Sequence, residues 1–288
     1  MKKRTKIAVA ATSVGVVGTL VYLAEKAAKS LTKKEEIESV DLKELKETRI
    51  RNNKGQTLTG YFTDHDYDTT MIIIHSLRTN GTDMISYYDY FKEKLPANYL
   101  LIDLAGYGKS DGEHITLDDS YEEDLIGWIS YLKRLNQKNI ILFGKQLGAN
   151  VILNSLDRLK VIPEIKCIIS DGASVSNEKM INDEINQMYP LLHNIIGFIT
   201  KLILKYQYHI PFSHLNILDN LHNYDRPILF IQSRNDPMGK LKNVFKIYNA
   251  KKDEKELILL KDAAYLYEYE DENDPYYSTM LDFIKSKL

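Results

Sequence analysis

The chain has little of what several classes of protein require. Its 288 residues include one cysteine, Cys167, which excludes an internal disulfide and any cysteine-rich metal site. Lys and Arg number 38 against 40 Asp and Glu, so the chain lacks the basic excess typical of nucleic-acid-binding proteins. The acidic run EYEDENDP lacks the spacing of a calcium loop and reads as solvated surface. The sequence therefore predicts no metal and no cofactor.

The N-terminus begins with the cationic stretch MKKRTK, which precedes an uncharged segment, Ile7–Ala24. As a helix this segment would cover roughly 27 Å, close to the ~30 Å of a bilayer core. A cleavable signal peptide is the alternative, but its apolar core is usually only about 7–15 residues long. The nearest cleavage candidate, residues 28–30 (AKS), follows two charged residues and has lysine at its centre. We expect a retained transmembrane anchor.

Four cations stand on each side of this segment, and Glu25, Glu35 and Glu36 dilute the second group, so the balance leans slightly toward an N-terminus inside. The expected location is the cell membrane, single-pass, with the domain extracytoplasmic. The expected domains are the cationic flank and anchor at 1–24, a charged linker or stalk at 25–44, and one folded domain at 45–288.

Apolar runs that alternate with helical patterns predict an α/β fold with a mostly parallel sheet covered on both faces. Two short strands around LKETRIRN and TLTGYFT are separated by NNKGQ, which has hairpin turn chemistry. The further strands are expected at MIIIHS, NYLLIDL, IILFG, KCIISDG, PILFIQS and ELILL.

The stretch LFGKQLGANVIL is the most informative motif. An apolar strand stops at Gly144, Gly148 follows, and an aliphatic helical pattern begins, which is the layout of a nucleophile elbow. The middle position, where an attacking group is needed, carries Gln146, whose neutral amide is not a nucleophile. The neighbouring residues include no Ser, Thr, Cys or Asp. We expect the amide to be hydrogen-bonded, because a buried unpaired amide costs about 1–3 kcal/mol.

With four further motifs in order, the sequence resembles the α/β-hydrolase family, and within it the bacterial membrane-anchored serine hydrolases with peptidase-like and esterase-like members. These motifs are IIIHSLRTNGTDM, LIDLAGYGKSDG, PILFIQSRNDPM and AAYLYEYEDENDPYYSTMLDFI. The resemblance implies an α/β-hydrolase fold over about residues 45–288, with a lid or helical insertion at 174–223. GYGKS also ends like a phosphate-binding loop, but Asp103 stands where that motif requires glycine.

The resemblance also assigns the positions of a Ser-His-Asp triad. The acid falls on Asp236, the nucleophile on Gln146 and the histidine on Tyr265, while the oxyanion donors would be the backbone N–H groups of Leu77 and Leu147. All seven histidines precede the acid, so none can occupy the usual position of the base. Two of the three triad side chains are therefore replaced.

These substitutions favour a membrane-anchored pseudoenzyme whose pocket binds a small apolar ligand, or whose surface binds a protein partner. The alternative is an active hydrolase of ester or peptide bonds with a relocated nucleophile, for which Ser76 and Ser233 are candidates. His75 adjoins Ser76, but neighbours on a strand point to opposite faces, so the two are poorly placed to act together. The resemblance implies that His75 is a structural histidine at the end of its strand. A purely structural membrane-proximal module is a third hypothesis.

Overall fold

The computed structural model describes residues 2–34, 41–42, 44–118, 120–210, 217–234, 241–260 and 275–288, with side chains from residue 15 onward. Within them lies one eight-stranded sheet in the order β1-β2-β4-β3-β5-β6-β7-β8. Its strands are β1 (Lys46–Arg51), β2 (Thr57–Phe62), β3 (Thr69–Ile74), β4 (Asn98–Ile102), β5 (Asn139–Lys145), β6 (Ile165–Asp171), β7 (Ile228–Ser233) and β8 (Lys255–Leu260).

The sheet is mostly parallel, as the sequence predicted. β2 pairs antiparallel with both β1 and β4. All the remaining pairs of the sheet, from β4–β3 to β7–β8, are parallel. The predicted β1–β2 hairpin turns at Gly55, which has φ +77° and donates its N–H to the carbonyl of Asn52 over 3.0 Å. The parallel strands of an α/β fold are buried on both faces, and β3 (TTMIII) is buried at every position.

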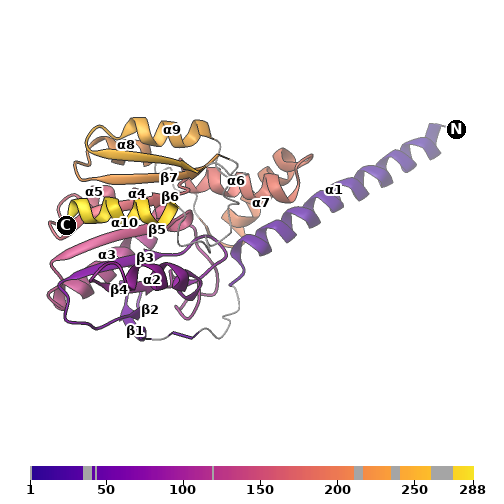
Figure 1. Ribbon diagram of the computed structural model, residues 1–288. Coiled ribbons are helices and arrows are strands. Elements are labelled where there is room, and N and C mark those ends of the chain that lie inside the picture. Colours follow the sequence, from indigo (N-terminus) through magenta and orange to yellow (C-terminus); the bar gives the residue numbers. More distant parts are fainter. Residues whose placement is uncertain are drawn as a thin grey trace.

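Helices cover both faces of the sheet (Figure 1). The helices are α1 (Lys2–Thr32), α2 (Ile85–Lys92), α3 (Ser120–Arg134), α4 (Leu147–Asn154), α5 (Leu156–Leu159), α6 (Asn177–Met188), α7 (His193–Tyr206), α8 (Ile217–His222), α9 (Leu241–Ala250) and α10 (Pro275–Lys287), with a short 3₁₀ turn at Gly81–Met84. One core cluster joins the sheet to α2 and α10, and the other joins it to α3, α4, α8 and α9. The segment 174–223, expected to be a lid or insertion, contains α6, α7 and α8.

The N-terminal helix corrects one expectation. Among the helices whose residues the structure describes, none combines the length and apolar character that a bilayer crossing demands. The expected transmembrane helix over Ile7–Ala24 and the single-pass, extracytoplasmic location at the cell membrane are therefore wrong.

The physical reason lies in what the described part of α1 contacts. It packs against α7 (Figure 1). Ala24, Ala28 and Leu31 are fully buried in the core. The hydroxyl of Thr200 on α7 donates to the carbonyl of Ala24 over 3.2 Å. The last residue of the uncharged segment therefore faces protein, whereas Val21 and Tyr22 before it are exposed. Residues 25–32, assigned by sequence to a linker, continue the same helix.

Candidate functional site

Gln146 stands at the strand-to-helix turn between β5 and α4, with φ +49° and ψ −102°. A positive φ is rare for a residue with a side chain and costs on the order of 1–3 kcal/mol. The two glycines of the motif allow the turn to close. A Cβ at Gly144 would lie 2.4 Å from the carbonyl carbon of Gly148, and one at Gly148 would lie 2.4 Å from the carbonyl oxygen of Ile74. The turn has the geometry of a nucleophile elbow.

The backbone N–H and carbonyl of Gln146 both form hydrogen bonds, whereas its side-chain nitrogen forms none with the described residues. Its N–H donates to the carbonyl of Asp171 over 2.7 Å, and its own carbonyl accepts from the N–H of Asn150 over 2.9 Å. The side chain is only 4% exposed, yet its Nε2 has no hydrogen-bond partner among the described residues. The hydrogen bond that we expected for this nitrogen is therefore not seen.

The turn that follows β3 lies against the elbow. The N–H of Gly148 donates to the carbonyl of His75 over 3.1 Å, which joins the first turn of α4 to this segment. Leu77 and Leu147, the expected oxyanion donors, are both buried here. Because Leu147 opens α4, its N–H belongs to the first helical turn, where backbone donors lack intrahelical partners.

His75 is a structural residue. Its Nε2 accepts the N–H of Leu104 over 3.2 Å, so its Nδ1 carries the proton and donates to the carbonyl of Ser76 over 2.7 Å. Burial lowers the pKa of this imidazole to about 4. With both nitrogens bonded to backbone, the ring cannot take a proton from a neighbouring hydroxyl.

Beside the elbow runs a chain of hydrogen bonds that the sequence did not reveal. Lys145 donates through Nζ to the hydroxyl of Tyr87 (3.0 Å), Tyr87 contacts the hydroxyl of Tyr276 (3.0 Å), and Tyr276 donates to Oδ2 of Asp171 (2.7 Å). Burial raises the pKa of Asp171, against the opposing effects of Lys145 and Tyr276. Lys145 is half-buried in this chain, which joins β5 and β6 to α2 and α10. No periodicity signals a contact between residues so distant in sequence.

A second feature missed by the sequence is Arg78, which follows Leu77 in the turn after β3. It has φ +62°, and its Nη2 lies 2.9 Å from Oε2 of Glu184 on α6. Both Nε and Nη2 are buried, and neither has a hydrogen bond to any described residue. The contact is therefore an ion pair without hydrogen-bond alignment. Burial raises the pKa of Glu184, and Arg78 opposes that rise.

The other predicted triad positions, Asp236 and Tyr265, lie outside the described residues. Of the two candidate nucleophiles, Ser233 ends β7 and is buried. Ser76 is also buried, and its hydroxyl lies 3.3 Å from both the carbonyl of Leu77 and the hydroxyl of Thr79. Neither contact of Ser76 is a base. Nowhere in the described ranges do three or more metal-ligating side chains gather.

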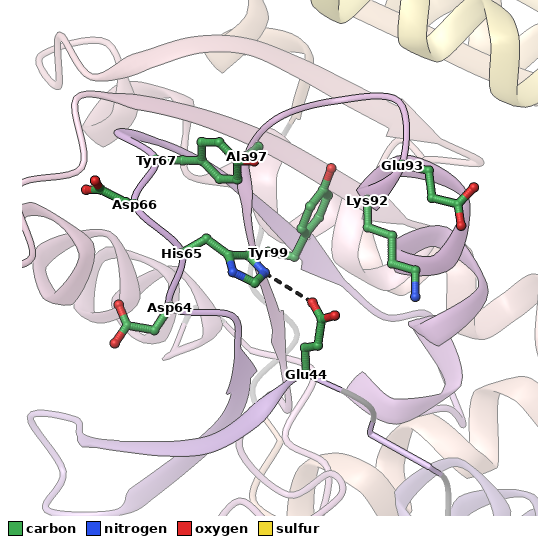
Figure 2. A pocket seen from close by; sticks show the side chains of 9 residues that line it. All are labelled: Glu44, Asp64, His65, Asp66, Tyr67, Lys92, Glu93, Ala97 and Tyr99. Carbon is green, nitrogen blue, oxygen red and sulfur yellow. Dashed lines mark ion pairs between the residues drawn. The ribbon is translucent and has the colours of Figure 1, made fainter.

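A cavity of about 810 Å³ lies at the other end of the sheet (Figure 2). His65 and Tyr67 line it just before β3, and Ala97 lines it just before β4. Figure 2 shows His65 turned toward Glu44, with 3.2 Å between Nε2 and Oε2. Because β3, β4 and β5 are parallel, this cavity lies at their amino ends and the elbow at their carboxyl ends. It is a separate feature.

Comparison with known proteins gives distant relatives. No family model matches the chain. Uncharacterized protein YqkD of Bacillus subtilis is 24% identical over 245 residues, which cover 80% of this chain and 76% of YqkD. Uncharacterized protein YfhR of Escherichia coli is 26% identical over 195 residues, which cover 66% of this chain and 61% of YfhR.

Solved structures resemble the chain more fully. A structure of the Pyrococcus furiosus esterase Pf2001 has a TM-score of 0.72 at 22% identity, covering 88% of this chain and 98% of that one. The chain has the α/β-hydrolase fold. The esterase RhEst1 from Rhodococcus shares the fold at a TM-score of 0.61 and 14% identity, covering 85% of this chain and 100% of that one. Est1E from Butyrivibrio proteoclasticus, with ferulic acid bound, has a TM-score of 0.62 at 16% identity, covering 83% of this chain and 98% of that one.

Proposed function

We propose that this α/β-hydrolase-fold protein binds a carbonyl-bearing ligand at its elbow and does not hydrolyse it. The observation that carries the proposal is Gln146 at the position of the nucleophile, in the strained geometry that presents a nucleophile. Acyl transfer in this arrangement needs an attacking group and a base that takes its proton. The amide of Gln146 supplies no attacking group, and His75 is committed to backbone bonds through both nitrogens.

The same geometry suits recognition of a hydrogen-bond acceptor. The buried Nε2 of Gln146 has no hydrogen-bond partner in the described part of the chain, so a ligand acceptor would supply one. A ligand carbonyl oxygen would accept from this group and from the N–H of Leu147 at the start of α4. Ferulic acid in the Est1E structure supports the choice of a carbonyl compound, since the two proteins share the fold.

The alternative is a working hydrolase with a relocated nucleophile. The contacts of Ser76 argue against it at that residue, because its hydroxyl contacts a carbonyl and another hydroxyl and no base. Ser233 is tested directly by replacement. Turnover that disappears in Ser233→Ala would establish the alternative.

Two measurements test the proposal. Purified protein should neither label with a fluorophosphonate probe nor hydrolyse p-nitrophenyl butyrate above background. It should bind methyl octanoate, an intact ester, in ligand-observed NMR, and Gln146→Met should weaken this binding because it keeps the side-chain volume and removes the donor. Gln137→Met is the control, because Gln137 lies in the turn before β5, at the opposite end of that strand from Gln146, and hydrogen-bonds Thr70. Covalent labelling, or undiminished binding by Gln146→Met, would contradict the proposal.

A further inference from the structure

Arg78 holds two buried donors, Nε and Nη2, with no hydrogen bond to any described residue. It sits in a backbone conformation that residues with side chains seldom adopt, at φ +62°. Its turn also carries Leu77, and the carbonyl of His75 at the start of that turn accepts from Gly148 in the elbow. Arg78 and Gln146 therefore stand in two adjoining turns at the carboxyl end of the sheet.

We propose that Arg78 recognises the carboxylate of a monocarboxylate ligand at the elbow, and that Glu184 occupies this place in the ligand-free protein. This rests on the proposed function and narrows its ligand class. A guanidinium presents parallel N–H donors that match the two oxygens of a carboxylate. Here Glu184 meets it at 2.9 Å without hydrogen-bond alignment, so Nε and Nη2 have no hydrogen bond among the described residues.

The charges favour a single negative charge on the ligand. The side chain that already faces Arg78 is a carboxylate, and the second unpaired donor, Gln146, is neutral. The neighbouring lysine of α6, Lys179, pairs with Asp183 one turn later and is not available for a second ligand charge. A monocarboxylate in place of Glu184 leaves the local charge unchanged once that side chain turns to solvent.

Glu184 comes from α6, within the segment that the sequence assigns to a lid or insertion. Its side chain is 13% exposed and that of Arg78 is 34% exposed, so the pair lies near the surface. Rotation of Glu184 outward would uncover the two buried nitrogens. Ligand binding would then be coupled to loss of the Arg78–Glu184 contact, while Ile181 and Ile185 keep α6 in the core.

The test compares octanoate with octanamide, which has the same chain and no charge, by isothermal titration calorimetry on the full chain. Wild type should bind octanoate at least about tenfold more tightly, the magnitude expected for a hydrogen bond to a charged group. Arg78→Met should abolish this preference. Arg49→Met is the matched control, because Arg49 pairs with Glu47 on β1 at the surface and should keep the preference.

Two further variants make the test independent of folding defects. Arg78→Lys keeps the charge and loses the fork, so it should retain only part of the preference. Glu184→Gln should strengthen octanoate binding severalfold, because it removes the competing carboxylate. Equal binding of both ligands by wild type, full preference in Arg78→Met or Arg78→Lys, or unchanged affinity in Glu184→Gln would each overturn the inference. Octanamide binding in any of these cases leaves the proposed function standing, whereas no binding of either ligand rejects both.

Discussion

The N–H of Gly148 donates to the carbonyl of His75, and this bond joins the two turns that form the candidate site. The approach is possible only because position 148 has no side chain. A Cβ there would lie 2.4 Å from the carbonyl oxygen of Ile74 and 2.8 Å from that of His75, and both are backbone atoms that cannot move aside cheaply. The elbow therefore depends on glycine for its packing as well as for its shape.

Gly148→Ala should lower the free energy of unfolding by about 1–3 kcal/mol, the range for overpacking a closed site. Urea denaturation followed by circular dichroism measures this change. Gly197→Ala is the control, because a Cβ on this α7 residue would meet its nearest atoms only at 3.8 Å. That control should be neutral or stabilising by up to about 1 kcal/mol, as for glycine replaced within a helix. Equal effects of the two changes would show that the elbow is not closely packed.

Tyr276→Phe should destabilise the protein by about 1–3 kcal/mol, because it removes the hydroxyl that donates to the buried carboxylate of Asp171. The same change separates Lys145 and Tyr87 from Asp171. Thermal denaturation at pH 7 provides the measurement. Tyr206→Phe, on a tyrosine that is 70% exposed, should leave the melting temperature unchanged. A neutral Tyr276→Phe would mean that the chain of hydrogen bonds contributes nothing to stability.

His75 should remain neutral in the folded protein until the pH approaches about 4, because burial lowers its pKa. An unfolded histidine titrates near 6.5, so between these values the unfolded chain binds more protons at this site. The contribution of His75 to stability is thus complete above pH ~6.5 and falls by up to roughly 3 kcal/mol as the pH drops toward 4. NMR titration of the imidazole Cε1–H gives the pKa directly. A midpoint near 6.5 would contradict the buried, doubly bonded ring.

Part of this site could be predicted from sequence because its signals are local. The apolar strand, Gly144 and Gly148 place Gln146 at a strand-to-helix turn, and the structure has it there. The same reasoning failed for α1, since an uncharged run of this length fits a bilayer or a protein surface equally well. In the described end of that run, Ala24 is buried against the domain, whereas Val16, Val17 and Val21 are exposed.

Other features depend on contacts that no local pattern encodes. Arg78 and Glu184 lie far apart in sequence and meet only once α6 is placed beside the turn after β3. Nothing near Lys145 in sequence suggests Tyr87 as its partner. The sequence predicted the elbow, and tertiary packing determined the ionic groups around it.

Gln146→Ser should not create a serine hydrolase. The new hydroxyl would stand at the elbow, but it needs a base, and His75 is held neutral with both nitrogens bonded to the Leu104 and Ser76 backbone. Hydrolysis of p-nitrophenyl butyrate by this variant should stay at background, and so should that of Tyr265→His, which adds a base with no nucleophile. Only the double variant, with Asp236 as the acid, could assemble all three groups of a triad. Turnover by Gln146→Ser alone would show that another residue already acts as the base, and would make the loss of the nucleophile the single step that inactivated the site.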